Sequence, residues 1–267
     1  MVMLPMSGRH IDRSPGNAII GGMSVAQPDR RSFFRIVECA ACAALWQSAG
    51  SAHALAASRH AERVPSHTRP MFIEKACLRV RNLAGMLLFY RQVIGLEVMS
   101  ETNDGAVLGV GSVGLIELIG DPDAVQPARN AAGLYHVAFE MPTRKDLARW
   151  AVHAVKSNFQ LSGAADHLVT ESFYLNDPEG NGVEVYASRP EKQWKWDAGR
   201  VAMGVFDPDI EGLLKLAIND RDEYTVAPSA MRIGHIHLKV GGVKAAENFY
   251  SKVIGLDVTR QAPGVVF

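Results

Sequence analysis

The sequence has no excess charge of either sign, since 28 lysine and arginine residues balance 28 aspartate and glutamate residues among 267. No basic field therefore indicates nucleic-acid binding, and no charged tail indicates an electrostatic partner. Only three cysteines occur (Cys39, Cys42 and Cys77), which are too few for a disulfide framework. No apolar run reaches the roughly 20 residues that a membrane-spanning helix needs. With 48% hydrophobic residues, the chain can form two small globular units or one large one.

Residues 1–70 differ in composition from the rest and are predicted to form an N-terminal extension. The order Arg-Arg-Ser-Phe-Phe-Arg at residues 30–35, followed by an alanine-rich segment, resembles a twin-arginine export signal. Ala52-His53-Ala54 has a small-x-small pattern, so we expect cleavage near residue 54 and a polar linker over 55–70. The protein would then be periplasmic or secreted. If the arginine pair is a chance feature, an alternative that Glu38 in the apolar segment favours, the protein is cytoplasmic.

A sequence repeat organises the remainder of the chain. Residues 77–98 (CLRVRNLAGMLLFYRQVIGLEV) match residues 237–258 (HLKVGGVKAAENFYSKVIGLDV) at a constant offset of 160 residues. Phe89-Tyr90 corresponds to Phe249-Tyr250, and the Val-Ile-Gly-Leu turn occurs in both copies. Each copy predicts a strand, a helix whose Phe-Tyr pair faces the core, and a turn into a second strand, so we infer a duplicated unit.

A related unit lies between the two copies. It begins with an alternating strand over 134–140, continues with a helix over 142–159 that Thr143 and Asp146 can cap, and ends in a hairpin around Asp177-Pro178-Glu179-Gly180-Asn181. The pattern strand-helix-strand-strand-strand thus occupies 73–120 and 134–188 and starts again at 232. We predict an α+β fold of tandem βαβββ modules, with a first domain over 71–190, a connector over 191–230 and a second domain that begins at 231–267. The third module ends in its second or third strand and a fourth is absent, so we expect a truncated chain.

Two polar residues interrupt apolar strands in the middle unit. Glu184 shares a strand face with Tyr186 while Val183 and Val185 point to the other face, and a buried carboxylate needs a cation or hydrogen bonds. His136 likewise lies on the face opposite its apolar neighbours. From the strands alone, a solvated glutamate and a hydrogen-bonded histidine remain the alternatives.

The module pattern and the hairpin together resemble the vicinal oxygen chelate superfamily, which includes glyoxalases, bleomycin-resistance proteins and extradiol dioxygenases. The likeness covers about residues 71–267 and is strongest to extradiol dioxygenases of the catechol 2,3-dioxygenase type. Their pattern of a histidine, an apolar-tyrosine pair, Asp-Pro-x-Gly and a glutamate is matched here by His167, Phe173-Tyr174, Asp177–Gly180 and Glu184. The small residue two positions before the histidine is Ala165, a minor departure. The resemblance implies half-barrels of mixed sheet built from paired modules around a metal.

The resemblance also implies the roles of the candidate site residues. Two histidines and one carboxylate suit a non-haem Fe(II) that binds a catecholate and dioxygen. If units two and three pair, the implied ligands are His136, Glu184 and His235, with His237 on the same face as the alternative. If units one and two pair, the corresponding residue is Lys75, a cation that leaves the site incomplete. His167 becomes an acid–base residue and Tyr174 a hydrogen-bond donor to the substrate; a surface histidine and a core tyrosine are the alternatives.

The implied function is extradiol ring cleavage of a catechol-type aromatic diol by dioxygen. One alternative is a lyase or isomerase on the same scaffold with Mn, Ni or Zn, which His167 argues mildly against. Another is an inactive small-molecule-binding protein, which Lys75 and the missing fourth unit favour. An incomplete last module also leaves a sheet edge that a second copy of the chain can pair with, as in a homo-oligomer.

Overall fold

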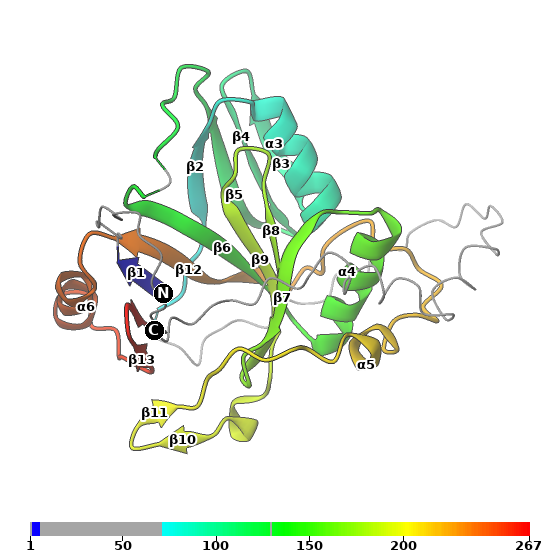
Figure 1. The fold of residues 1–267 in the computed structure, drawn as a ribbon. Helices are drawn as coiled ribbons and strands as arrows, with labels where there is room; N and C mark the ends of the chain where they lie inside the picture. The colour runs from blue at the N-terminus through cyan, green and yellow to red at the C-terminus, as the bar shows by residue number, and fades with distance from the viewer. Residues whose placement is uncertain (1, 6–70, 129) are drawn as a thin grey trace, which may run out of the picture.

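The computed structural model describes residues 2–5, 71–128 and 130–267 (Figure 1). The expected export signal, its cleavage site, the linker, and Cys39 and Cys42 lie outside the described residues, so these expectations stay predictions. Cys77 is exposed and unpaired. In the described part of the chain, no helix combines the length and apolarity needed to cross a membrane.

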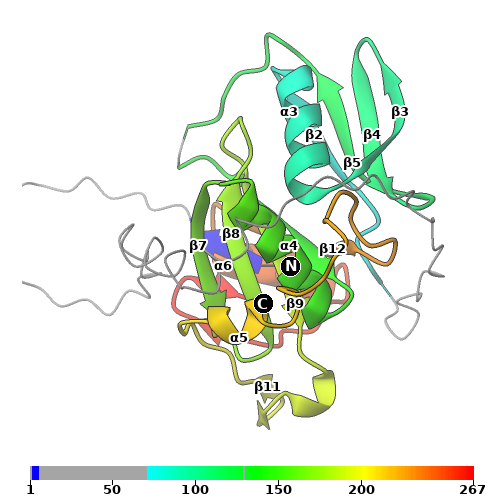
Figure 2. The same cartoon turned by 90° about the vertical axis from the view of Figure 1, so that its right-hand side faces the viewer.

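The first module is a four-stranded sheet with one helix, and it forms a distinct unit in Figure 2. Strand β2 (Ala76–Val80) leads into helix α3 (Leu83–Phe89), which continues as a π-helical turn, η2 (Tyr90–Ile94). Gly95, at a φ of 88°, ends this helix in the left-handed conformation that glycine adopts most readily. Strands β3 (Glu97–Thr102), β4 (Gly105–Val110) and β5 (Val113–Gly120) complete the order β2-β5-β4-β3.

The second module repeats this arrangement. Its elements are β6 (Gly133–Met141), α4 (Arg144–Lys156), β7 (Leu161–Asp166), β8 (Thr170–Asn176) and β9 (Gly182–Ser188), in the sheet order β6-β9-β8-β7. As the sequence predicts, the Thr143 side chain caps α4 by accepting from the Asp146 backbone N–H. In both modules the first strand runs parallel to the last, which requires the helical crossover between them.

A strand from the other end of the chain pairs with the third module. A connector with η3 (Glu191–Gln193), β10 (Trp196–Asp197), β11 (Arg200–Val201) and α5 (Ile210–Leu214) leads to β12 (Arg232–Val240), α6 (Val243–Lys252), β13 (Gln261–Ala262) and β14 (Val265–Val266). Strand β1 (Val2–Pro5) lies parallel to β12 and antiparallel to β14. The order β12-β1-β14-β13 is therefore that of the other two modules, with β1 in the place of the fourth strand. No pattern in the sequence predicts this strand.

The second and third modules share one eight-stranded sheet. Strand β12 pairs antiparallel with β6, so the first strands of the two modules lie side by side (Figure 1). The described residues therefore pair units two and three, the arrangement that brings His235 rather than Lys75 to the second module. Over the part of the chain that the structure describes, mixed sheets with helices and no closed barrel confirm the predicted α+β class.

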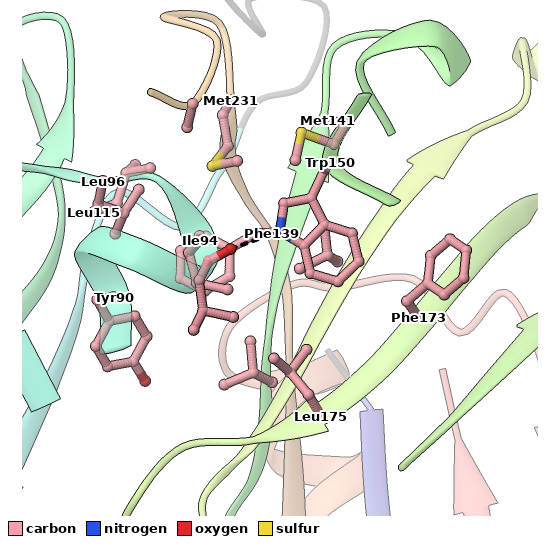
Figure 3. Close-up of a cluster of buried hydrophobic side chains, with 14 of the residues drawn as sticks. Tyr90, Ile94, Leu96, Leu115, Phe139, Met141, Trp150, Phe173, Leu175 and Met231 are labelled. Carbon is pink, nitrogen blue, oxygen red and sulfur yellow. Dashed lines mark hydrogen bonds between the residues drawn. The ribbon is translucent and has the colours of Figure 1, made fainter. Parts of the chain in front are cut away.

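The first and second modules are joined by a continuous hydrophobic core. Trp150 of α4 is fully buried, and its Nε1–H donates to the Val93 carbonyl of the first module at 2.8 Å (dashed line in Figure 3). Tyr90 and Phe139, from β6, pack with ring centroids 6.2 Å apart. The Glu179 carboxylate adds a polar junction, since it accepts from the backbone N–H groups before α3 at 2.6 and 2.8 Å.

One core prediction from the repeat is wrong. The repeat predicts that Phe249 and Tyr250 face the core as Phe89 and Tyr90 do. Tyr90 is fully buried, but no residue of α6, which contains the second pair, is buried, and Phe249 is 48% exposed. The difference lies in what covers each helix: α4 and the connector pack against the first module, whereas the main described contacts of α6 are with β1 and β14.

Candidate metal centre

Three adjacent strands bring His136, Glu184 and His235 to one point. Ala138 of β6 pairs with Glu184 of β9 on one side and with His235 of β12 on the other. His136 lies two residues before Ala138, and alternate residues of a strand share a face. All three polar side chains therefore project from the same face of the sheet, while Val183 and Val185 enter the core on the opposite face, as the sequence predicts.

The three side chains are in direct contact. His136 Nε2 lies 3.0 Å from Glu184 Oε2 and 3.0 Å from His235 Nε2, and His235 Nε2 lies 3.1 Å from Glu184 Oε2. His136 and Glu184 are buried, whereas 23% of the His235 side chain is exposed. In the described residues these three form the group of histidine, cysteine and acidic side chains whose ligand atoms all lie within 4.8 Å.

Burial and mutual contact set the charges of this cluster. Burial lowers the pKa of His136, so its ring is neutral near pH 7 although Glu184 partly opposes the shift. Burial by itself raises the pKa of Glu184, but the neighbouring rings of His235 and His136 outweigh that effect and hold this pKa well below its ordinary value. A neutral imidazole and an ionised carboxylate are the forms that bind metal ions.

The spacing of the donor atoms fits a metal ion. Two ligand atoms about 2.1 Å from one ion lie about 3.0 Å apart at right angles and about 3.4 Å apart at the tetrahedral angle. The observed separations of 3.0, 3.0 and 3.1 Å match three corners of one octahedral face. Two histidines and a carboxylate in this arrangement leave the remaining positions open for other ligands.

His167 and Tyr174 lie beside the cluster. The Tyr174 hydroxyl is 2.6 Å from His167 Nε2 and 3.4 Å from Glu184 Oε1. Burial, followed by the charge of Glu184, raises the pKa of Tyr174 well above its ordinary value, so the phenol keeps its proton. The structure thus brings together all five residues that the sequence singles out: His136, His167, Tyr174, Glu184 and His235.

His237 lies next to His136 but is not one of the three residues whose ligand atoms meet. It pairs with His136 across the ladder, and the two rings are 4.8 Å apart. Its Nε2 is buried without a hydrogen-bond partner in the described residues, and burial lowers its pKa to about 2. Lys75 lies in the first module, where it forms an ion pair with Glu117.

Two further residues support the site and were not predicted. The Tyr186 ring packs on His235 with centroids 5.3 Å apart, and the Gly204 carbonyl of the connector lies 2.7 Å from His167 Nδ1. The alternation of β9 places Tyr186 on the Glu184 face and could have indicated it. Nothing in the connector sequence indicates Gly204.

Comparisons with known proteins identify the family to which the chain belongs. The family model of the glyoxalase/bleomycin resistance protein/dioxygenase superfamily matches residues 71–185. Over 193 residues the chain is 40% identical to catechol-2,3-dioxygenase of Bacillus subtilis (strain 168), which covers 71% of this chain and 67% of that protein. The chain belongs to this superfamily. The resemblance inferred from the hairpin and the repeat is therefore confirmed.

Two further matches have lower sequence identity. Biphenyl-2,3-diol 1,2-dioxygenase 3 of Rhodococcus globerulus is 32% identical over 111 residues, covering 40% of this chain and 58% of that protein. Among solved structures, lactoylglutathione lyase from Agrobacterium tumefaciens has a TM-score of 0.36 and 23% identity, covering 44% of this chain and 94% of its own. The curated relatives are named as dioxygenases, the class that the His167–Tyr174–Glu184 pattern predicts, and the matches span about two thirds or less of their length.

Proposed function

We propose that this chain is an extradiol dioxygenase that opens the ring of a catechol-type aromatic diol with dioxygen and uses non-haem Fe(II). The observation that carries the proposal is the contact triangle of His136, Glu184 and His235 with His167 and Tyr174 directly beside it. The names of the curated relatives, which act on catechol or biphenyl-2,3-diol, support the same substrate class.

The three ligands are suited to hold a metal ion, and two of them, His136 and Glu184, are buried. Fe(II) held by these residues would supply open coordination positions for a catecholate and dioxygen and a path for electrons between them. Both atoms of dioxygen enter the opened ring, so the reaction needs no added reductant. Because Glu184 and His136 are buried, the charge of Glu184 and the hydrogen bonds of both residues act in a medium of low dielectric constant, which would strengthen their hold on the ion.

The neighbouring pair manages protons. In the proposed reaction, His167 Nε2 takes a proton from one hydroxyl of the diol, because this nitrogen faces the site and lies against the Tyr174 hydroxyl. The Tyr174 phenol stays protonated and then donates its hydrogen bond to a substrate oxygen. A base and a donor on neighbouring sides of the substrate keep the diol in the orientation that ring cleavage needs.

The proposal is tested by loading the protein with Fe(II) without air, measuring bound iron, and then adding catechol or biphenyl-2,3-diol with air. A yellow ring-fission product is expected. Glu184→Gln should lose iron and activity together. Its matched control is Glu117→Gln, at the corresponding strand position of the first module, which should keep both.

Two results would contradict the proposal. Iron bound at one ion per chain without any ring-fission product from either diol would remove the dioxygenase function. Wild-type iron content in Glu184→Gln would move the metal away from the triangle. Activity restored by Mn, Ni or Zn with a substrate that consumes no oxygen would instead favour a lyase or isomerase.

A further inference from the structure

A short segment of the connector, residues 204–206, crosses back to the end of β7 and is here called the strap. Phe206 and Asp166 form a two-way backbone bridge, in which the Asp166 N–H donates to Phe206 at 2.9 Å and the Phe206 N–H donates to Asp166 at 3.0 Å. The strap is therefore fixed beside the turn that carries His167. A Cβ at Gly204 would lie 2.4 Å from the exposed Phe206 ring, so a larger residue there would require this ring to move.

The strap makes a specific contact with the His167 ring. The Gly204 carbonyl lies 2.7 Å from His167 Nδ1. A carbonyl oxygen only accepts hydrogen bonds, so the proton of this bond resides on Nδ1. In the neutral ring, Nε2 then carries the lone pair and faces the Tyr174 hydroxyl at 2.6 Å. The Gly204 contact thus specifies one tautomer of the neutral ring.

The backbone of His167 is held as firmly as its ring. Arg189 binds both carboxylate oxygens of Asp166 at 2.7 and 2.8 Å, and the same carboxylate accepts from the Leu168 N–H at 2.7 Å. The His167 N–H donates to the Thr170 carbonyl at 2.8 Å. With its turn anchored on one side and the strap on the other, the imidazole has little freedom to rotate.

We propose that the strap is a positioning element, which holds His167 in the Nδ1–H tautomer and so directs the basic Nε2 to the Tyr174 side of the site. This proposal rests on the acid–base role given to His167 in the proposed function. In the opposite tautomer, two lone pairs would face each other across the Gly204 contact and the nitrogen facing Tyr174 could no longer accept a proton. Supporting groups of this kind typically contribute about 10- to 100-fold to activity.

The tautomer can be observed without any assay of activity. NMR chemical shifts of the ring nitrogens and carbons, recorded on isotopically labelled protein loaded with Zn(II) and at a pH where the shifts no longer change, distinguish the two neutral forms. His167→Gln identifies the signals by their loss. We expect Nδ1 to be protonated in the wild-type protein. Protonation at Nε2 would overturn the proposal, and this measurement needs no strap variant to fold.

A pair of variants then separates the strap backbone from its side chain. Phe206→Pro removes the N–H that bridges to Asp166, whereas Phe206→Ala keeps this N–H and removes only the ring, which is 53% exposed. We expect mixed tautomers and a turnover number lower by about 10- to 100-fold in Phe206→Pro, with bound Fe(II) unchanged. Phe206→Ala should resemble the wild type in both readouts.

The outcomes distinguish this proposal from the proposed function. Wild-type tautomer and turnover in Phe206→Pro would overturn the role of the strap, as would equal effects of the two Phe206 variants. Loss of iron in Phe206→Pro would overturn it too, because the strap would then support the metal ligands. A wild-type protein that shows the Nδ1–H form but opens no diol ring would leave the strap contact in place while refuting the dioxygenase function.

Discussion

Replacement of Gly234 by alanine should weaken the metal site through a single added methyl group. Gly234 precedes His235 in β12, and a Cβ at this position would lie 1.8 Å from Tyr186 Oη and 2.9 Å from Glu140 Oε2. Ordinary contacts begin at 3.4 Å, so the phenol has to move by about 1.6 Å. Tyr186 is buried and packs on His235 with ring centroids 5.3 Å apart, so this movement reaches a metal ligand.

The magnitude follows from the two consequences of the added group. Forced repacking typically costs about 1–3 kcal/mol, and each kcal/mol lowers the melting temperature of a domain of this size by about 2–4 °C. Disturbing a residue that orients a metal ligand typically lowers metal affinity by about 10- to 100-fold. Thermal unfolding of the metal-free protein measures the first effect. Competition with a chromogenic chelator, without air for Fe(II) and in air for Zn(II), measures the second.

Two controls make this prediction sharp. Gly163→Ala also places a methyl group on a strand glycine, but no atom of the described residues lies within 4 Å of its Cβ, so affinity and stability should change little. Gly234→Ala combined with Tyr186→Phe removes the closest clash and should recover part of the lost affinity. Wild-type metal affinity in Gly234→Ala would refute the coupling between Tyr186 and His235.

Three other perturbations have expected outcomes. Trp150→Phe leaves the buried Val93 carbonyl without its donor and should lower the free energy of unfolding in urea by about 1–3 kcal/mol. Glu179→Gln weakens two charge-assisted bonds to the start of α3 and should cost about 1–2 kcal/mol without changing metal affinity. Because burial lowers the pKa of His136 below its unfolded value, the stability from its neutral form is complete above about pH 6.5 and is lost as the pH falls. Melting temperatures of the metal-free protein should therefore fall below that pH, and His136→Phe should flatten the slope.

The predicted part of the site came from two local regularities and from the family resemblance, which implied the metal-ligand and acid–base roles. Strand alternation determined that Glu184 and His136 leave the core face, and the constant offset of the repeat aligned His235 with Lys75. The alignment also defined two alternatives for module pairing. Pairing of units two and three supplies His235, which can bind a metal, whereas pairing of units one and two supplies Lys75, which cannot. The observed ladder between β6 and β12 agrees with that choice.

The unpredicted part depends on contacts between segments that no local pattern connects. Strand β1 has four residues and no alternation long enough to detect, and its place beside β12 follows from an open sheet edge elsewhere in the chain. The strap contacts His167 through the backbone carbonyl of Gly204. Because every residue has a backbone carbonyl, no residue type in the sequence indicates this contact. Phe249 has the same sequence context as Phe89, but its burial depends on what packs against α6. In each case the missing information is tertiary.

The first module shows how the same scaffold satisfies a carboxylate without a metal ion. Glu117 of β5 pairs with Cys77 of β2, just as Glu184 pairs with Ala138 in the second module. Lys75, two residues before Cys77, therefore occupies the position that His136 has in the second module. The Lys75 ammonium contacts the Glu117 carboxylate, and this hydrogen bond raises the lysine pKa, which keeps the cation charged. An ammonium group neutralises the carboxylate but offers no coordination position to a substrate. In addition, β2 is an edge of its sheet in the described residues, whereas β6 receives a second histidine from β12. Replacing Lys75 by histidine would therefore supply two of three ligands, so a functional centre requires both the ligand residue and a paired module.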